Sequence, residues 1–264
     1  MTITIQQAIF LGIVQGLTEF IPISSSGHLV FFQSLFGLKE PQLFFDILLH
    51  LGTLMAVVVF FREDIWEIIQ GIGRSLKEKE VHPSARLFLW ILLATLPTGL
   101  MGVLLKDWFE SLFGEPKTVG VMLLITGSFL WLTRLIKKEG RAIEQMTWVD
   151  SLLIGIAQGI AIIPGISRSG ITISAGLFRG LNRELSGKFS FLLSIPAILA
   201  ATVLEFRKMG SQGEIGLSLL GMVVAFFVGL FSLGILMKII KGGKISAFAY
   251  YCWAIGSLII LLTG

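Results

Sequence analysis

The sequence GIVQGLTEFIPISSSG at residues 12–27 has a copy, GIAQGIAIIPGISRSG, at residues 155–170. Laid over each other without a gap, at an offset of 143, the two stretches share eight identities in sixteen positions. In each, an apolar segment ends in a break of proline, serine and glycine, and a short apolar segment follows, 27–37 in the first copy and 169–179 in the second. The chain therefore contains an internal repeat, and these broken segments decide the fold.

The two short segments have about half the length that a bilayer requires, since a transmembrane helix takes about 20 residues. Segments of this length are typical of re-entrant helices. Irregular backbone at membrane depth is tolerated only where protein or a water-filled cavity satisfies its polar groups. The breaks at residues 22–27 and 164–170 therefore predict a polar cavity.

The composition of the whole chain indicates that these segments lie in lipid. The 264 residues are 54% hydrophobic and only 14% charged, against roughly 45–50% and 25% in soluble domains. This is the composition of a membrane protein, and it leaves no room for a sizeable soluble domain. A net charge of +4 would suggest nucleic acid in a soluble protein. In a membrane protein the basic residues set the topology instead, so we expect no nucleic-acid partner.

Apolar runs bounded by charge give the expected architecture. We predict an all-α polytopic membrane protein, a single integral membrane domain over 1–264, with internal repeats of about 1–140 and 145–264. Each half reads as one re-entrant helix pair plus three transmembrane helices. Because three crossings is an odd number, the second half must be inserted upside down relative to the first, which is the inverted-topology repeat of many transporters.

Basic residues orient this arrangement. We assign the amino terminus, both ends of the first hairpin and the loops near 106–117 and 206–214 to one side, which collects five basic residues: Lys39, Lys106, Lys117, Arg207 and Lys208. The opposite side, which includes the 62–86 loop, collects fifteen. The positive-inside rule places the fifteen in the cytoplasm. We therefore predict a multi-pass protein with both termini outside.

Glu19 is the only charged residue before Lys39, and it lies inside an apolar segment one turn from the first break. A lone carboxylate at a helix centre costs about 2.5–3.5 kcal/mol on insertion scales, so this residue needs a compensating role. Gln15 lies four residues earlier, on the same helix face. Because polar residues crowd around Glu19, we favour a functional carboxylate over one that is satisfied for structure alone.

Arg168 is the second charge of this kind, placed between two serines in the second break. A cation, backbone amides freed by neighbouring glycines and a helix N-terminus together make an anion site. The structural alternative is an arginine that pairs with Glu19 and staples the two halves together, which is compatible with function. Because Arg168 occupies the repeat position of Ser25, we expect these two residues to face each other.

Serines, one histidine, one glutamate and an opposed arginine suit phosphoryl transfer. Serine or histidine can be the covalent nucleophile, arginine can neutralise charge on phosphate oxygens, and the carboxylate can act as a base or bind a divalent metal. We predict Ser25 as the nucleophile, with His28 close enough to take its proton, and a phosphohistidine route through His28 as the alternative. His50, one turn from Asp46, could extend the polar cavity, and we assign no role to His82.

Two stretches, 15–28 and 164–172, resemble the signatures of the bacitracin-resistance type undecaprenyl-diphosphate phosphatases. One signature is Glu/Gln-x-x-x-Glu running into a serine-rich break, and the other is Pro-Gly-x-Ser-Arg-Ser-x-x-Thr. The match covers both motifs and the whole hydropathy plan. Where many relatives carry a first glutamate, this chain has Gln15, which the family pattern allows but which weakens any model with two carboxylates on one metal.

The resemblance implies a phosphatase of the bacterial inner membrane, facing outward, that hydrolyses undecaprenyl diphosphate to undecaprenyl phosphate and inorganic phosphate. It also implies bacitracin resistance, recycling of the lipid carrier for cell-wall synthesis and a divalent cation, Mg²⁺ or Ca²⁺. The resemblance makes Glu19, Ser25, His28 and Arg168 the catalytic residues and Glu19 also the metal ligand. The implied substrate-binding residues are Gln15, Ser24, Ser26, Ser167, Ser169 and Thr172.

Two other classes of function compete with this interpretation. An inverted repeat with broken helices is also the plan of secondary transporters, so a flippase or carrier for a lipid phosphate or another anion is the alternative. The serines and the histidine near Glu19 favour chemistry, because a carrier needs no nucleophile. A purely structural subunit would leave two costly buried charges unexplained.

Overall fold

The computed structural model describes residues 3–38, 42–112, 115–136, 139–206 and 215–263. Within these ranges the chain forms helices and no strands, and six helices are long and apolar enough to cross a membrane. They are α3 (Leu43–Phe60), α5 (Pro83–Leu104), α7 (Pro116–Leu132), α10 (Arg183–Phe206), α11 (Ile215–Lys241) and α12 (Phe248–Thr263). The all-α polytopic class is thus confirmed. Three of the six lie in each of the halves expected from the sequence, while the inversion of one half stays a prediction.

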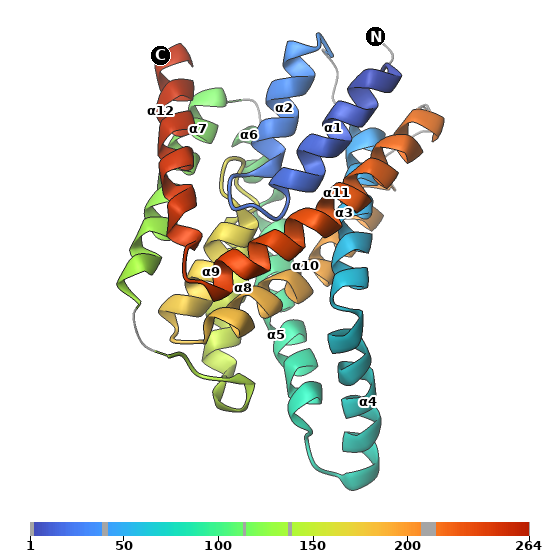
Figure 1. Cartoon of the computed structure of the whole chain (residues 1–264), viewed down its shortest axis with the longest axis vertical. Helices are drawn as coiled ribbons and strands as arrows, with labels where there is room; N and C mark the ends of the chain where they lie inside the picture. The colour runs from blue at the N-terminus through green and yellow to red at the C-terminus, as the bar shows by residue number, and fades with distance from the viewer. Residues whose placement is uncertain (1–2, 39–41, 113–114, 137–138, 207–214, 264) are drawn as a thin grey trace.

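The two broken segments form two helical hairpins with matching bounds. The first is α1 (Ile5–Thr18) with α2 (Ser25–Leu35), and the second is α8 (Trp148–Ile160) with α9 (Arg168–Phe178). Both helices of the second hairpin begin 143 residues after their counterparts, which is the offset of the sequence repeat. The loops between the helices of each hairpin meet near the centre of the molecule (Figure 1).

The same capping chemistry starts α1 and α8. Thr4 and Thr147 are the two N-cap residues, and each accepts a hydrogen bond from the backbone N–H three residues on, at Gln7 and at Asp150. The side chains of Gln7 and Asp150 in turn accept a hydrogen bond from the backbone N–H of the cap residue, which completes a capping box in each copy. The repeat therefore extends beyond the identical residues to the points where the chain enters its helices.

Glycines shared by the two copies let each hairpin cross a long helix closely. α1 packs along α11, and α8 packs along α5. A Cβ atom at Gly12 would lie 2.7 Å from the carbonyl oxygen of Gly221, and one at Gly155 would lie 2.2 Å from that of Ala94. Neither distance admits a side chain, so these glycines are required for the close helix approach common in membranes.

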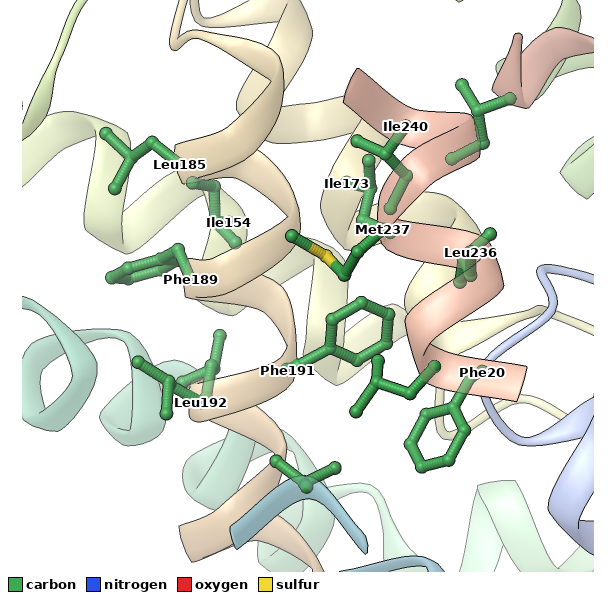
Figure 2. Close-up of a cluster of buried hydrophobic side chains, with 14 of the residues drawn as sticks. Phe20, Ile154, Ile173, Leu185, Phe189, Phe191, Leu192, Leu236, Met237 and Ile240 are labelled. Carbon is green, nitrogen blue, oxygen red and sulfur yellow. The ribbon is translucent and has the colours of Figure 1, made fainter. Parts of the chain in front are cut away.

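The main hydrophobic core lies directly beneath the first break. Phe20, the residue after Glu19, is 1% exposed and packs edge to face on Phe191 of α10, with ring centroids 5.7 Å apart. Figure 2 shows both rings among side chains of α9, α10 and α11, including Ile173 and Met237. Because aromatic rings bury large apolar areas, this packing anchors the backbone next to Glu19.

The structure also contains helices that the hydropathy pattern did not predict. Residues 62–86 read as a charged loop, yet α4 (Arg62–Glu78) occupies most of it. This helix is amphipathic, with Ile68 and Gly71 buried and a charged outer face, so an analysis based on apolar runs misses it. The shorter elements are α6 (Lys106–Leu112), η1 (Thr133–Leu135), η2 (Ile143–Gln145) and η3 (Ile245–Ala247).

Both ends of the described chain lie at the same end of the molecule, and the connection from α4 to α5 lies at the opposite end (Figure 1). This agrees with the sidedness expected from the basic residues. Which end faces the cytoplasm stays a prediction. Some residues of that count lie outside the described ranges: Lys39, Lys137, Lys138, Arg207 and Lys208.

Candidate active site

Glu19 is the point at which the two breaks meet. It caps the C-terminus of α1, where its N–H donates to the carbonyl oxygen of Gln15, and it is only 7% exposed. Arg168, the first residue of α9, donates from Nη2 to Glu19 Oε1 in an ion pair. Ser25, the first residue of α2, donates from Oγ to Glu19 Oε2 over 2.6 Å. One carboxylate therefore holds a hydroxyl from one break and a guanidinium from the other.

We expected Ser25 and Arg168 to face each other; in the structure each contacts Glu19, on a different oxygen of its carboxylate. The ion pair also has the geometry of the structural alternative weighed above, since it joins the two hairpins. It fixes both side chains at the same buried point. A charged pair of this kind is costly to break, because removal of one partner leaves the other charge uncompensated.

Gln15 lies against Glu19 and is fully buried. Its Nε2 donates to Glu19 Oε2 at 3.2 Å and to Thr53 Oγ1 of α3 at 3.5 Å. Its Oε1 has no hydrogen-bond partner among the described residues. A buried oxygen without a partner costs about 1–3 kcal/mol, so this atom is ready to accept a donor or to bind a cation.

The backbone at the first break is strained. Ser24 has φ 70° and ψ 95° and makes no side-chain hydrogen bond to cap α2. A non-glycine residue at positive φ costs free energy of order 1–3 kcal/mol. The first-turn N–H groups of α2 thus lack the cap acceptor that most helices have. Such a helix N-terminus is suited to an anion, and Ser25 lies at its first position.

The second break is more regular and is tied to its surroundings. Ser167 is an N-cap at φ −75° whose side chain accepts from the N–H of Gly170. Ser169 donates to the carbonyl oxygen of Phe20 over 2.8 Å, which links the two breaks. Thr172 lies 2.6 Å from Ser190 Oγ on α10. These three side chains are buried and hold the backbone of Arg168, and their contact with substrate stays a prediction.

The imidazole of His28 has a hydrogen-bond partner at each nitrogen, and neither partner is the hydroxyl of Ser25. Its Nδ1 lies 2.8 Å from the carbonyl oxygen of Ser24 and its Nε2 lies 2.6 Å from the hydroxyl of Tyr251 on α12. The sequence predicted that His28 would take the proton of Ser25, but that proton points to Glu19. The physical reason is that other acceptors lie closer, because the carbonyl oxygen of Ser24 takes the Nδ1 contact and the Glu19 carboxylate takes the Ser25 proton.

His50 lies beside the site, as the sequence hypothesis allowed. Its Nε2 is 3.9 Å from Glu19 Oε2, and its Nδ1 donates to the carbonyl oxygen of Asp46. The Asp46 carboxylate accepts a hydrogen bond from Gln33 of α2 over 2.6 Å. His82 caps α5 and bonds to Ser84. Tyr251 could not be predicted as part of the site, because 223 residues separate it from its partner His28.

The donor set favours a hard cation over a softer metal. Among the described residues, no three of His, Cys, Asp and Glu come together as a metal site. The Glu19 carboxylate and the unpartnered Gln15 Oε1 are both oxygen donors. A set of one or two protein oxygens fits Mg²⁺, which is usually bound through few carboxylates together with substrate phosphates and waters.

Fold and site define a polytopic membrane protein in which the two breaks meet at a buried ion pair, Glu19–Arg168. The chain belongs to the family of bacitracin resistance protein BacA, whose model matches residues 8–258. The undecaprenyl-diphosphatase of Carboxydothermus hydrogenoformans is 47% identical over 262 residues, which are 97% of this chain and 96% of that protein. Those of Desulforapulum autotrophicum and Methanosphaera stadtmanae are 45% and 41% identical, over 97% and 98% of both chains.

Proposed function

We propose that this protein is a membrane phosphatase that hydrolyses undecaprenyl diphosphate to undecaprenyl phosphate and inorganic phosphate. The observation that carries the proposal is the hydrogen bond from Ser25 to Glu19, beside the guanidinium of Arg168. It combines a hydroxyl nucleophile, a proton acceptor and an anion partner. Relatives named undecaprenyl-diphosphatase match nearly the whole chain. The product is a lipid carrier for cell-wall synthesis, and its recycling accounts for bacitracin resistance.

A lipid substrate is supported by the surface of α2. The helix that begins at Ser25 continues with three exposed apolar side chains, Val30, Phe31 and Leu35, which are 56%, 59% and 68% exposed. Exposed apolar residues on a helix in a membrane protein face lipid. A prenyl chain can therefore lie along α2 in the bilayer while its diphosphate reaches the start of the same helix.

In the first step, the oxygen of Ser25 attacks the terminal phosphorus. The proton of the hydroxyl passes to Glu19 Oε2, along the existing hydrogen bond. The bond from the terminal phosphorus to the bridging oxygen breaks, so undecaprenyl phosphate leaves and a phosphoserine remains. Arg168 neutralises charge on the phosphate oxygens, because protonation of Glu19 releases its guanidinium from the ion pair.

In the second step, water attacks the phosphorus of the phosphoserine and the bond from phosphorus to Ser25 Oγ breaks. Glu19 returns its proton to that oxygen, and inorganic phosphate leaves. We assign His28 to this step as the base that takes a proton from water. Its Nδ1 must carry a hydrogen, because the carbonyl oxygen of Ser24 can only accept. The lone pair of the neutral ring is then on Nε2, 2.6 Å from the Tyr251 hydroxyl. The proton of water therefore reaches the ring through that hydroxyl, which gives its own proton to Nε2 as it receives the one from water.

A divalent cation, Mg²⁺ or Ca²⁺, is part of the proposal. Glu19 and the Oε1 of Gln15 would hold it together with phosphate oxygens of the substrate. A carboxylate offers about four lone-pair sites, so Glu19 can accept from Ser25 and also face a cation. The cation would supply charge neutralisation for the leaving phosphate.

We also propose that the protein lies in the inner membrane with both termini outside and, as the family resemblance implies, with the site facing outward. The support is the fifteen-to-five distribution of basic residues. Labelling of single cysteines from outside should reach residue 111 and miss residue 78. Labelling of 78 alone would reverse the orientation.

The direct test is release of phosphate from a polyprenyl diphosphate by detergent-purified protein, with and without a chelator. We expect release from the wild type, loss of release with chelator and recovery when Mg²⁺ or Ca²⁺ is added. No release under any of these conditions would overturn the phosphatase proposal. Phosphate release that is unchanged by chelator would overturn only the proposed role of the cation. Transfer of the intact lipid across vesicles without release would make the protein a carrier.

A further inference from the structure

The side chain of His28 is held from a distant part of the chain. Tyr251 of α12 places its hydroxyl 2.6 Å from His28 Nε2, and the two rings stack with an interplanar angle of 18° and centroids 5.8 Å apart. The ring therefore has one hydrogen-bond partner at Nδ1 and one at Nε2. Two partners on different atoms of the ring define its orientation.

The direction of these two hydrogen bonds follows from elementary chemistry. Because the carbonyl oxygen of Ser24 has no proton, Nδ1–H is the donor there. In the neutral ring Nε2 then carries a lone pair, and the Tyr251 hydroxyl donates to it. If the ring gains a proton at Nε2, the same hydroxyl accepts instead, since a phenol is both donor and acceptor. Tyr251 can hold His28 in both protonation states without moving.

α12 is anchored where it meets the first break. Cys252, the residue after Tyr251, is fully buried, and its thiol donates to the carbonyl oxygen of Pro22 over 3.4 Å. α12 also packs along α7 over much of its length. One turn of α12 thus touches the break both before and after its serines. Tyr250, by contrast, packs on Trp131 and Trp253 and is 60% exposed.

We propose that Tyr251 orients His28 and, through its hydroxyl, connects Nε2 as the proton-accepting atom to the attacking water. The proposal rests on the role of His28 in the proposed hydrolysis. Tyr251 makes its contribution through the imidazole and not through the lipid. The last helix of the second half therefore supports chemistry that the first hairpin performs.

The hydrogen bond can be tested without substrate. The chain has three histidines, so nitrogen NMR of ¹⁵N-histidine protein gives few signals, and His50→Gln and His82→Gln assign them. Under alkaline conditions that keep the ring neutral, we expect Nδ1 of His28 to be the protonated nitrogen and Nε2 the bare one. Tyr251→Phe should shift the Nε2 signal, and the matched control Tyr250→Phe should leave it unchanged. An unchanged Nε2 signal in Tyr251→Phe would overturn the proposal, whether or not the protein proves to be a phosphatase.

Kinetics then test whether the contact serves turnover. Tyr251→Phe keeps the stacked ring and removes only the hydroxyl, so we expect kcat to fall roughly tenfold, the worth of one hydrogen bond, with KM within about twofold. Tyr250→Phe should match the wild type. In a His28→Ala background, Tyr251→Phe should cause no further loss, because its partner is gone. Full turnover in Tyr251→Phe, or an equal further loss in His28→Ala, would overturn the positioning role.

Discussion

The two broken hairpins share a frame and differ in charge. Their helices begin at the same offset, both start with a threonine capping box, and both carry a buried glutamine in the first helix. The acid, the hydroxyl and the imidazole all lie in the first copy. At the positions of Glu19 and His28 the second copy has Ile162 and Ile171, and at the position of Ser25 it has Arg168. A duplicated scaffold thus divides an acid–base site and an anion partner between its copies.

The copies also differ in how firmly they are held. Eight of the eleven residues of α9 are buried, against two of the eleven in α2. Asp150, the third residue of α8 and part of its capping box, is fully buried and pairs with Arg141 at 3.0 Å and with Arg179 at 2.8 Å, whereas its counterpart Gln7 is neutral. The second hairpin is therefore a fixed holder for Arg168, and the first is the accessible side of the site.

The largest effect should come from the nucleophile in the accessible copy. Ser25→Ala removes the attacking oxygen, so we expect turnover to fall by about three powers of ten or more. Ser26→Ala is the matched control, because its hydroxyl bonds weakly to Ser24 at 3.4 Å, and it should cost less than tenfold. Phosphate release by each purified variant gives the comparison. An active Ser25→Ala beside an inactive His28→Ala would favour the phosphohistidine route.

Glu19→Gln comes next, since it removes the proton acceptor and the partner of Arg168 together. General-base removal costs roughly 10²–10⁴-fold, and we expect a loss of about 10³. The variant should still insert and fold, because an amide is easier to bury than a carboxylate. Its melting temperature should be lower than that of the wild type, because Arg168 is left unpaired. The double variant Glu19→Gln/Arg168→Ala should regain part of that melting temperature, because the unpaired charge is gone. Turnover near that of the wild type would reduce Glu19 to a structural residue.

Arg168→Lys separates charge from shape in the fixed copy. A guanidinium can hold two phosphate oxygens in one plane, and an ammonium cannot. We expect about a hundredfold loss of turnover, on the order of 3 kcal/mol, comparable to losing a preorganised donor, with most lipid binding retained. Arg179→Lys is the matched control at the other end of α9, where the arginine only pairs with Asp150, and it should leave turnover nearly unchanged. Full turnover in Arg168→Lys would remove its catalytic assignment.

These contrasts also show which features a sequence can predict. The hairpins, the six spans and the meeting of the two breaks follow from hydropathy and from the repeat, because each depends on local pattern or on symmetry. The pairing of Arg168 with Glu19 was only the structural alternative, since the repeat placed Arg168 opposite Ser25. Contacts from outside the repeated motifs do not. Tyr251 on His28 and His50 beside Glu19 depend on how α12 and α3 pack. The helix α4 was not predicted because its apolar stripe is narrow and its outer face is charged. The direction of the Ser25 proton depends on a side-chain rotation that no residue pattern encodes.

The smallest effect on turnover, and the finest comparison, concerns the two equivalent glutamines. Gln15 and Gln158 both donate from Nε2 to a threonine, Thr53 or Thr98, and both have an Oε1 without a hydrogen-bond partner among the described residues. Glutamate at either position buries a new carboxylate. At position 15 the new carboxylate would lie beside that of Glu19, whose Oε2 is 3.2 Å from Gln15 Nε2. Arg168, which pairs with Glu19, and the proposed cation offset the repulsion between the two negative charges.

At position 158 a glutamate would have no such neighbour in its own copy, because Ile162 replaces Glu19 and Arg168 is turned toward the first hairpin. We therefore expect Gln15→Glu to keep turnover within a few-fold and to melt near the wild type, and to tighten Mg²⁺ dependence. Gln158→Glu should lower the melting temperature by several degrees, since an unpaired buried carboxyl is costly, while turnover measured well below that melting temperature stays close to normal. The reverse pattern, with Gln15→Glu unstable and Gln158→Glu unaffected, would mean that the environment of Gln15 is no more cationic than that of its copy.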